Sequence, residues 1–203
     1  MKKLFVCTIP MLEKNKLKKL DYQNEKGEFM KTSAFPSIVL LNKYIGDDAD
    51  VQICTIRDDC ENSSINNECF LEELKMLGDE KGVNLVVSKE IIIPHNETKV
   101  KNLTIFSELM DLYSQKENYK LYIDMTYGSK VTSAEIFASL TYAEMKGLNI
   151  EELCYGFYDH SIKDNNIGVY YSLRYVYDLL SLINTSSKYL PSEKIESLIK
   201  GLI

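Results

Sequence analysis

The sequence predicts an α/β protein with a Rossmann-like, mostly parallel sheet flanked by helices. Short segments rich in β-branched and aromatic residues alternate with longer segments in which apolar residues recur at helical spacing. Strands that alternate with helices in this way form parallel sheets with right-handed crossovers. The 203 residues, 45% hydrophobic and 27% charged, are enough for one domain with a substantial core.

The amino-terminal region predicts a strand, an inserted hairpin and a helix. Residues 3–9 form the apolar first strand. Apolar segments at both ends of 20–30 flank turn residues at 24–27, a pattern that is typical of a β-hairpin. Pro36 then fits the first turn of a helix that ends at Gly46.

The middle of the chain predicts further strands and helices in alternation. Strands are expected at residues 51–56, 83–87 (with 91–93 as an extension), 119–125 and 153–158. Helices are expected at residues 70–77, 100–113 and 131–145. The polar residues 57–67 predict a loop, and 169–173 predict an antiparallel edge strand.

The carboxyl-terminal residues form a second unit. Residues 175–203 predict two amphipathic helices separated near Pro191. They are too few for an independent enzymatic domain. We therefore expect a main domain over residues 1–174 and a short helical extension over 175–203, packed on the sheet or on a partner subunit.

Composition indicates a cytoplasmic protein without a metal site. The five cysteines are an odd number and lack the spacing of a zinc site, which favours reduced thiols and no metal. No apolar run approaches the roughly 18 residues of a membrane span, so we expect no membrane partner. The apolar start is too short for a secretion signal and fits a first strand.

Positive charge is concentrated near the amino terminus. Residues 2–31 hold eight Lys and four acidic residues, which gives this region a charge of +4. Because the whole chain has a net charge of −6, the remaining residues together carry −10. Only Arg57 and Arg174 are arginines, which argues against a surface for duplex nucleic acid. A small, localised anionic ligand fits this charge distribution better, and a solvated basic loop explains any single one of these lysines at least as well.

A five-residue turn, Thr126-Tyr127-Gly128-Ser129-Lys130, connects a predicted strand to a predicted helix. Unpaired backbone N–H groups and the positive end of the helix dipole meet at such a turn, and glycine lets a ligand approach closely. The turn is neither a dinucleotide fingerprint nor a Walker A loop. Its spacing fits an anion-binding site and equally fits a capped junction with a solvated lysine.

Several motifs in a fixed order resemble one protein family. A strand that ends in Asp-Met-Thr-Tyr-Gly-Ser-Lys at 124–130 precedes Leu-Thr-Tyr-Ala at 140–143 and Cys-Tyr-Gly at 154–156. A hairpin and Thr-x-x-Phe-Pro at 32–36 come earlier. Together these motifs resemble the CRISPR-associated Rossmann fold (CARF) proteins over most of residues 1–175. The chain departs from that family in its first loop, where members often carry glycines and a Ser or Asn.

The resemblance implies a homodimer that binds a cyclic oligoadenylate, such as cyclic tetra-adenylate, across its two-fold axis. It further implies a ring nuclease without cofactor or metal, in which a ribose 2′-OH attacks the adjacent phosphate. Lys130 and Ser129 are the expected catalytic residues, one for charge stabilisation and one for phosphate positioning. The residues expected to contact the ligand are Thr8, Pro10, Thr126, Tyr127, Gly128, Ser129 and Lys130.

Two alternatives remain open from the sequence. The protein could be a sensor that binds the cyclic compound without cutting it and acts on a partner chain through its carboxyl-terminal helices. It could also be an unrelated Rossmann-like enzyme for a mononucleotide, with Asp124 as its catalytic carboxylate. A strand-end aspartate that accepts backbone N–H groups of the turn is the simpler interpretation of Asp124.

Overall fold

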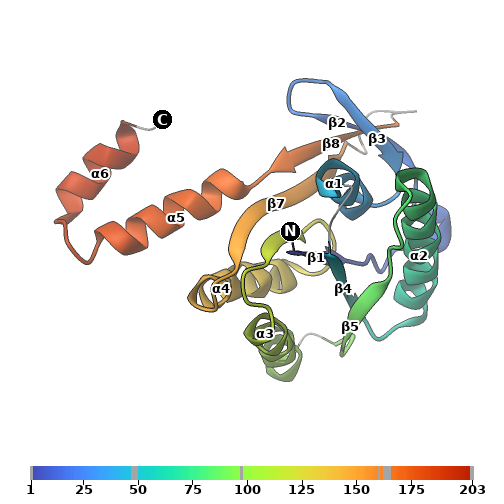
Figure 1. The fold of residues 1–203 in the computed structure, drawn as a ribbon, viewed down its shortest axis with the longest axis horizontal. Helices are drawn as coiled ribbons and strands as arrows, with labels where there is room; N and C mark the ends of the chain where they lie inside the picture. Colours follow the sequence, from blue (N-terminus) through green and yellow to red (C-terminus); the bar gives the residue numbers. More distant parts are fainter. Residues whose placement is uncertain (1, 47–49, 97, 160, 162–165, 202–203) are drawn as a thin grey trace.

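A single mixed sheet organises the protein, as the computed structural model shows (Figure 1). The structure describes residues 2–46, 50–96, 98–159, 161 and 166–201. Over these residues the chain forms eight strands: β1 (Lys2–Thr8), β2 (Leu20–Asn24), β3 (Phe29–Ser33), β4 (Asp50–Asp58), β5 (Val87–Ile93), β6 (Lys120–Asp124), β7 (Asn149–Tyr158) and β8 (Ile167–Ser172).

Over the same residues, four helices lie between strands of the sheet, and two more follow the last strand. They are α1 (Pro36–Tyr44), α2 (Glu61–Lys81), α3 (Lys99–Ser114), α4 (Lys130–Met145), α5 (Arg174–Ser186) and α6 (Ser192–Lys200), and a short 3-10 turn, η1, covers Lys14–Lys16. The α/β class and the mostly parallel, helix-flanked sheet that the sequence predicts are confirmed.

The strand order is β3-β2-β8-β7-β6-β1-β4-β5. β1 pairs in parallel with β4 and β6, and the parallel arrangement continues through β5 on one side and β7 on the other. The carboxyl ends of these five strands therefore lie at one edge of the sheet, where α/β proteins bind ligands. β8 runs antiparallel to β7.

The predicted hairpin forms, and it changes the position of β8. β2 and β3 pair antiparallel, and β2 also pairs in parallel with β8 along Asp21–Asn24. The expectation that residues 169–173 form an edge strand is therefore wrong. The inserted hairpin covers the free side of β8 and makes β3 the edge on that side.

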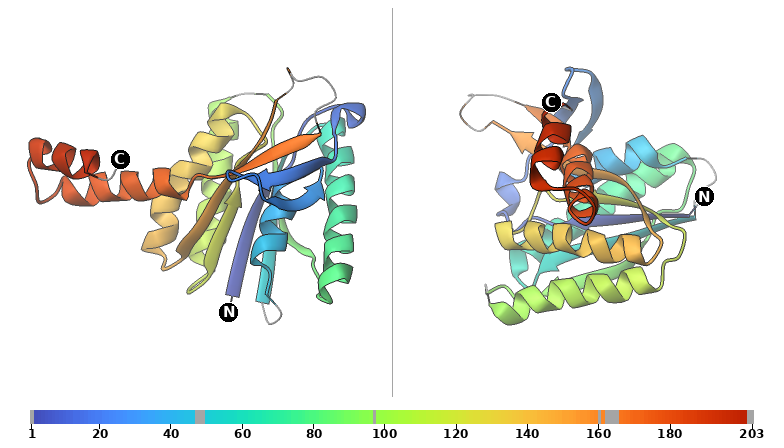
Figure 2. Two further views of the ribbon diagram at one scale, coloured as in Figure 1. Left: turned by 90° about the horizontal axis from the view of Figure 1, so that it is seen from above. Right: turned by 90° about the vertical axis from the view of Figure 1, so that its left-hand side faces the viewer.

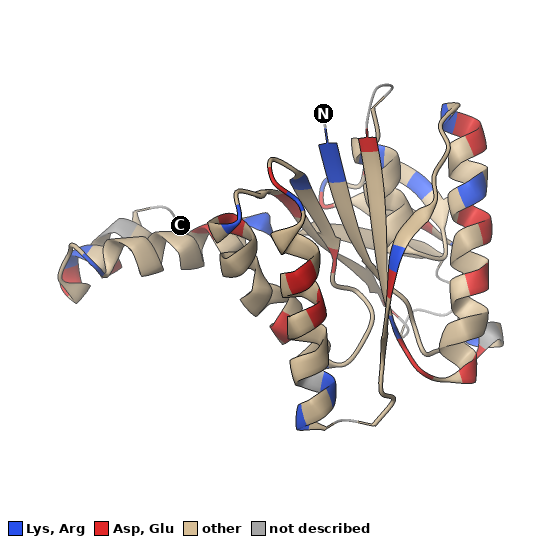
Figure 3. Ribbon diagram, turned by 60° about the horizontal axis from the view of Figure 1, so that its bottom comes forward, with Lys and Arg blue, Asp and Glu red and all other residues tan. Residues whose placement is uncertain are grey.

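Helices cover both faces of the sheet. α1 and α2 pack on one face, and α3 and α4 pack on the other (Figures 1 and 2). Successive residues of a strand point to opposite faces, so Leu4 and Val6 belong to the core under α3 and α4, whereas Phe5 and Cys7 belong to the core under α1 and α2. Charged residues of both signs lie along the outer side of α2 (Figure 3).

The predicted boundaries on both sides of α2 are wrong. Residues 57–67 were expected to form a loop, but α2 begins at Glu61, and its first turns bury the polar side chains of Ser63 and Asn66. Residues 83–87 were expected to form a strand, but β5 begins at Val87 and includes the predicted extension. Gly82 ends α2 in a left-handed conformation, so the next residues form a connection that still buries Leu85.

Within the described residues, the closest packing of the helical extension on the main domain is near its start. Tyr177 is 3% exposed, and its ring packs edge-on against Phe137 of α4 at 5.9 Å between centroids. Beyond these turns α5 and α6 project away from the sheet (Figures 1 and 2). Among the described residues of the extension, α6 does not pack on the sheet, and packing on a partner subunit stays a prediction.

Candidate functional site

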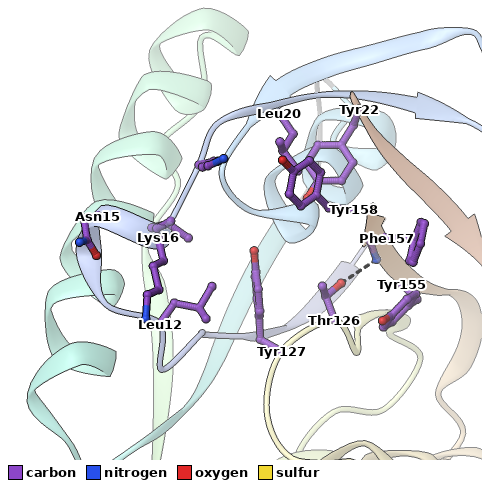
Figure 4. Close-up of a pocket in the computed structure, with 13 residues that line it drawn as sticks. Leu12, Asn15, Lys16, Leu20, Tyr22, Thr126, Tyr127, Tyr155, Phe157 and Tyr158 are labelled. Atoms are coloured by element: carbon purple, nitrogen blue, oxygen red, sulfur yellow. Dashed lines mark hydrogen bonds between the residues drawn. The ribbon is translucent and has the colours of Figure 1, made fainter. Parts of the chain in front are cut away.

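The candidate site lies at the carboxyl edge of the sheet, over the ends of β1, β6 and β7 (Figure 4). Two features meet there. One is the turn between β6 and α4, residues 125–129. The other is a cavity of about 570 Å³ beside that turn.

Asp124 holds the turn from inside. This last residue of β6 accepts hydrogen bonds from the backbone N–H of Thr126, at 2.9 Å, and from the Thr126 hydroxyl. The same hydroxyl accepts a hydrogen bond from the N–H of Gly156 on β7, at 2.8 Å (Figure 4). Thr126 therefore joins β6 to β7. Its hydroxyl already donates one hydrogen bond and accepts another within the protein.

Thr8 and Tyr127 fix the turn from the other side. The Thr8 hydroxyl is buried, donates to the Asp124 carbonyl at 3.2 Å and accepts from the N–H of Tyr127 at 3.0 Å. The Tyr127 hydroxyl donates to the Ala34 carbonyl just before α1, at 2.9 Å. Three strands and the start of α1 thus preorganise the backbone of the turn.

The second half of the turn leaves its backbone donors free. Gly128 has φ of +100°, a conformation that favours glycine, and the Ser129 hydroxyl caps α4 by accepting from the N–H of Thr132 at 3.1 Å. Among the described residues, none accepts a hydrogen bond from the N–H groups of residues 128–131. The Lys130 side chain is exposed, and no described acidic residue pairs with it. Free backbone donors at a helix start next to a cation are groups that can accept an anion.

The charge on Asp124 is poorly solvated. Its side chain is fully buried, and burial raises its pKa to about 6, against the lowering effect of the hydrogen bonds from Thr126. Cys7 and Cys154 are its register neighbours on β1 and β7, and burial together with the Asp124 carboxylate raises the pKa of both thiols. Asp124 is thus enclosed by protein, as expected of a structural strand-end carboxylate.

Aromatic side chains dominate the cavity. Five of them line it, and they come from β2, the turn and the end of β7: Tyr22, Tyr127, Tyr155, Phe157 and Tyr158. Leucines from the segment between β1 and β2 and from the start of β2 complete the apolar walls: Leu12, Leu17 and Leu20. Figure 4 shows Tyr127 between the side chains of that segment and those of β7.

The segment after β1 is held in place by α2. The Asn66 side chain is buried and donates to the carbonyls of Pro10, at 3.0 Å, and Leu12, at 2.7 Å. This clamp positions Lys16 and Lys18 at the cavity. Lys18 also lies over the Tyr158 ring, 5.8 Å from its centroid. Of the amino-terminal lysines that the structure describes, Lys16 and Lys18 are the ones that line the cavity.

The structure separates the residues that the sequence grouped together. Thr126 and Tyr127 line the cavity, whereas Gly128, Ser129 and Lys130 follow it at the start of α4. Thr8 and Pro10 are buried beneath the turn and the loop, where they support the backbone. Their contact with a ligand stays a prediction.

Sequence reasoning missed most of the cavity walls. The sequence places Tyr22 only in a hairpin, and Leu12, Lys16 and Phe157 carry no local signal for a binding site. The sequence signal that corresponds to the buried position of the Tyr22 ring is a pair of glycines, Gly156 and Gly168, which leave space for it. A Cβ atom at Gly168 would lie 2.6 Å from its ring, and one at Gly156 would lie 3.3 Å away.

Comparisons with known proteins identify no family. No protein-family model matches the chain, and no curated protein matches its sequence. Among the described residues, no three His, Cys, Asp or Glu side chains are grouped so as to hold a metal ion. Within the same residues, no helix has both the length and the apolar character needed to cross a membrane.

Proposed function

We propose that the protein binds a cyclic oligoadenylate, such as cyclic tetra-adenylate, across a homodimer and cleaves it as a ring nuclease. The observation that supports this best is the set of free N–H groups at 128–131, placed beside Lys130 and next to an aromatic cavity. A phosphate fits the first two features, and a nucleobase fits the third. The motif order from Asp124 to Gly156 supports the same ligand class.

The proposed reaction forms no covalent bond between the protein and the ligand. The ribose 2′-hydroxyl gives its proton to water as its oxygen attacks the adjacent phosphorus, the bond from phosphorus to the 5′-oxygen breaks, and that oxygen takes a proton from water, so the products carry a 2′,3′-cyclic phosphate and a 5′-hydroxyl. The protein holds the attacking and leaving oxygens in line and stabilises the charge on the phosphate. Lys130 supplies the cation, and Ser129 and Gly128 supply backbone donors.

A homodimer follows from the symmetry of the ligand. A cyclic oligoadenylate with an even number of nucleotides presents equivalent phosphates on opposite sides of its ring. Two copies of the turn, related by a two-fold axis, would contact both sides with the same residues.

The five cysteines are free thiols, which is the state that a cytoplasmic protein keeps.

The decisive test incubates the pure protein with cyclic tri-, tetra- and hexa-adenylate in the presence of EDTA. We expect one ring size to bind and to yield linear products that end in a cyclic phosphate. Binding without linear products for all three rings would remove the nuclease and leave the sensor. No binding to any ring would remove both.

A non-catalytic sensor is the second candidate, and the projecting extension favours it. Tyr175 and Val176 on α5 are 61% and 38% exposed, and Leu180 is 38% exposed. Such an apolar surface could act on a partner chain when the ligand binds at the turn. The third candidate, a mononucleotide enzyme that uses Asp124 as its catalytic carboxylate, is weakened because that carboxylate is fully enclosed.

A further inference from the structure

One face of the sheet is covered by helices over only part of its width. Leu153 on β7 belongs to the core under α3 and α4, and side chains alternate along a strand, so Tyr155 and Phe157 point to that same face. Their side chains are 39% and 41% exposed. The helices on this face therefore leave the carboxyl-terminal half of β7 uncovered.

The uncovered region continues across three more strands. Phe157 is the register partner of Val169 on β8, Val169 is next to Gln23 on β2, and Gln23 is next to Phe29 on β3. Paired residues of neighbouring strands share a face, so these side chains form one row, which ends at Phe29 with 64% exposure. We call this surface the bare sheet face, and its apolar members are Phe29, Tyr155, Phe157, Val169 and Tyr171.

Helix α5 carries a second apolar surface that is only partly covered. Val176, Leu180 and Ile183 are spaced by four and three residues, so they lie along one side of the helix. They are 38%, 38% and 37% exposed, and Tyr175 in the first turn is 61% exposed. We call Val176, Leu180 and Ile183 the extension stripe.

The two surfaces lie on the same side of the sheet but do not meet within one chain. Tyr177 at the start of α5 belongs to the core under α3 and α4, so the extension leaves from the side that also carries the bare sheet face. From there α5 and α6 project away from the sheet (Figures 1 and 2). A second copy that approaches this side along a two-fold axis brings each extension to the sheet of the other copy.

The dimensions and the areas of the two surfaces match. The 13 residues of α5 make a helix about 20 Å long, and four neighbouring strands span about 14 Å, so α5 can cross the whole row. At 150–250 Å² for each aromatic side chain, the exposed fractions correspond to roughly 300 Å² of apolar area on the bare sheet face. With a similar area on α5, covering both surfaces in both copies buries on the order of 1,200 Å², the size of a stable interface.

We propose that the protein forms a homodimer by exchanging its helical extensions, so that the extension stripe of each copy packs on the bare sheet face of the other. This inference rests on the homodimer of the proposed function but not on its ligand. It adds which surfaces join the two copies. Because Tyr155 and Phe157 also line the cavity beside the turn, the extension of one copy lies next to the candidate site of the other.

Sedimentation velocity of the ligand-free protein tests the exchange. We expect the wild type to be a dimer, and Phe29→Asp on the sheet and Ile183→Asp on α5 should each raise the dissociation constant of the dimer at least tenfold. Both side chains are exposed, so both variants should keep the fold, as urea denaturation measures. Met76→Asp is the matched control, because this exposed apolar residue lies on α2, over the opposite face.

A mixture of the two variants identifies the surfaces as partners of each other. In a mixed dimer, the intact extension of Phe29→Asp meets the intact sheet face of Ile183→Asp, so one of the two contacts is restored. The equimolar mixture should therefore dimerise more tightly than either variant alone. A wild-type monomer would overturn the exchange and leave the extension stripe to a different protein, and wild-type dimerisation of the single variants or a mixture without recovery would also overturn it.

Cyclic tetra-adenylate separates this inference from the proposed function. Dimers that weaken and recover as expected, in a protein that binds no cyclic ring, would keep the exchanged extensions and remove the proposed function. Variants that dimerise like the wild type and still cleave the ring would do the opposite. Both proposals are supported when the variants lose the dimer and its cleavage activity together and the mixture regains both.

Discussion

Two strands of the sheet end in a buried aspartate, and the two carboxylates are compensated in different ways. Asp58 ends β4 and is 2% exposed, and Asp124 ends β6 and is fully buried, with β1 between their strands. Asp58 receives the ammonium of Lys101, which is 1% exposed, at 2.6 Å. Asp124 receives the N–H and hydroxyl of Thr126 and the thiol of Cys154 on one carboxylate oxygen, and no described residue forms a hydrogen bond with its other oxygen.

The difference explains why only one strand end is a candidate site. At β4, the cation that balances the carboxylate comes from the first turn of α3, so that this helix start carries an internal ion pair. At β6, the carboxylate uses its acceptors to shape the turn, while the N–H groups at the start of α4 and the cation of Lys130 remain directed to the outside. An anion from outside the protein can accept hydrogen bonds from these N–H groups and pair with Lys130.

The largest effect is expected when the internal cation is removed. Lys101→Met leaves Asp58 buried and unpaired, which should lower the free energy of unfolding by about 3–5 kcal/mol. Urea denaturation followed by circular dichroism measures this change. Lys75→Met, at an exposed position of α2, should stay within about 0.5 kcal/mol of the wild type. A similar small change for Lys101→Met would show that Asp58 needs no cation.

Removal of the outward cation should affect activity and leave stability unchanged. Lys130→Ala should reduce the rate of cyclic oligoadenylate cleavage by about 10²- to 10³-fold, as expected when one group that stabilises transition-state charge is lost. Single-turnover cleavage under EDTA measures the rate, and urea denaturation should give the wild-type stability. Lys146→Ala, at the other end of α4, is the matched control. Full cleavage by Lys130→Ala would remove this residue from the mechanism.

The two aspartates show what the sequence could and could not predict. The turn after Asp124 was recognisable because strand, turn residues and helix are contiguous, and because Thr126, Gly128 and Ser129 have strong local preferences. The ion pair at Asp58 was not, because Lys101 lies 43 residues away and occupies the first turn of a helix, where a lysine normally faces water.

The walls of the cavity illustrate the same limit. They combine side chains from Leu12 to Tyr158, and no local pattern joins such distant segments. The start of α2 was missed because its polar residues face protein: Asn66 binds two carbonyls of the loop after β1. The apolar stripe of α2 therefore begins several residues after the first residue of the helix, and the stripe alone places the start too late. The hairpin was predicted well because its strands and turn adjoin.

The pH dependence of stability should distinguish Asp124 from a paired carboxylate. Because its folded-state pKa of about 6 lies above the usual 3.8, the folded protein binds more protons than the unfolded chain between these values. The contribution of this carboxyl is full below about pH 4 and is lost as the pH rises through 6, by about 3 kcal/mol in total. Asp124→Asn cannot titrate and lacks this loss.

Urea denaturation between pH 4 and 7 tests this prediction. The stability of the wild type relative to Asp124→Asn should fall by about 2 kcal/mol over that range, which is most of the total. Asp111→Asn, at an exposed position of α3, should run parallel to the wild type. Parallel curves for Asp124→Asn as well would mean that its carboxyl titrates as it does in the unfolded chain.

The smallest effect concerns Ser129, whose hydroxyl caps α4 beside the free N–H groups. Ser129→Ala should lower the free energy of unfolding by about 1 kcal/mol and weaken ligand binding several-fold, because the first turn of the helix frays. Ser129→Asn keeps a side-chain oxygen for the N–H of Thr132, so it should restore both properties. Denaturation and cleavage are measured on the same preparations.

This pair of variants separates capping from chemistry. The hydroxyl oxygen already accepts the N–H of Thr132 and lies 3.1 Å from the Thr132 hydroxyl, so the part of Ser129 that faces a ligand is its backbone N–H. Cleavage by Ser129→Asn at close to the wild-type rate would therefore assign Ser129 to the framework of the turn. A stable but inactive Ser129→Asn would show instead that the hydroxyl contacts the phosphate, and catalysis would then depend on a side chain as well as on the cation of Lys130.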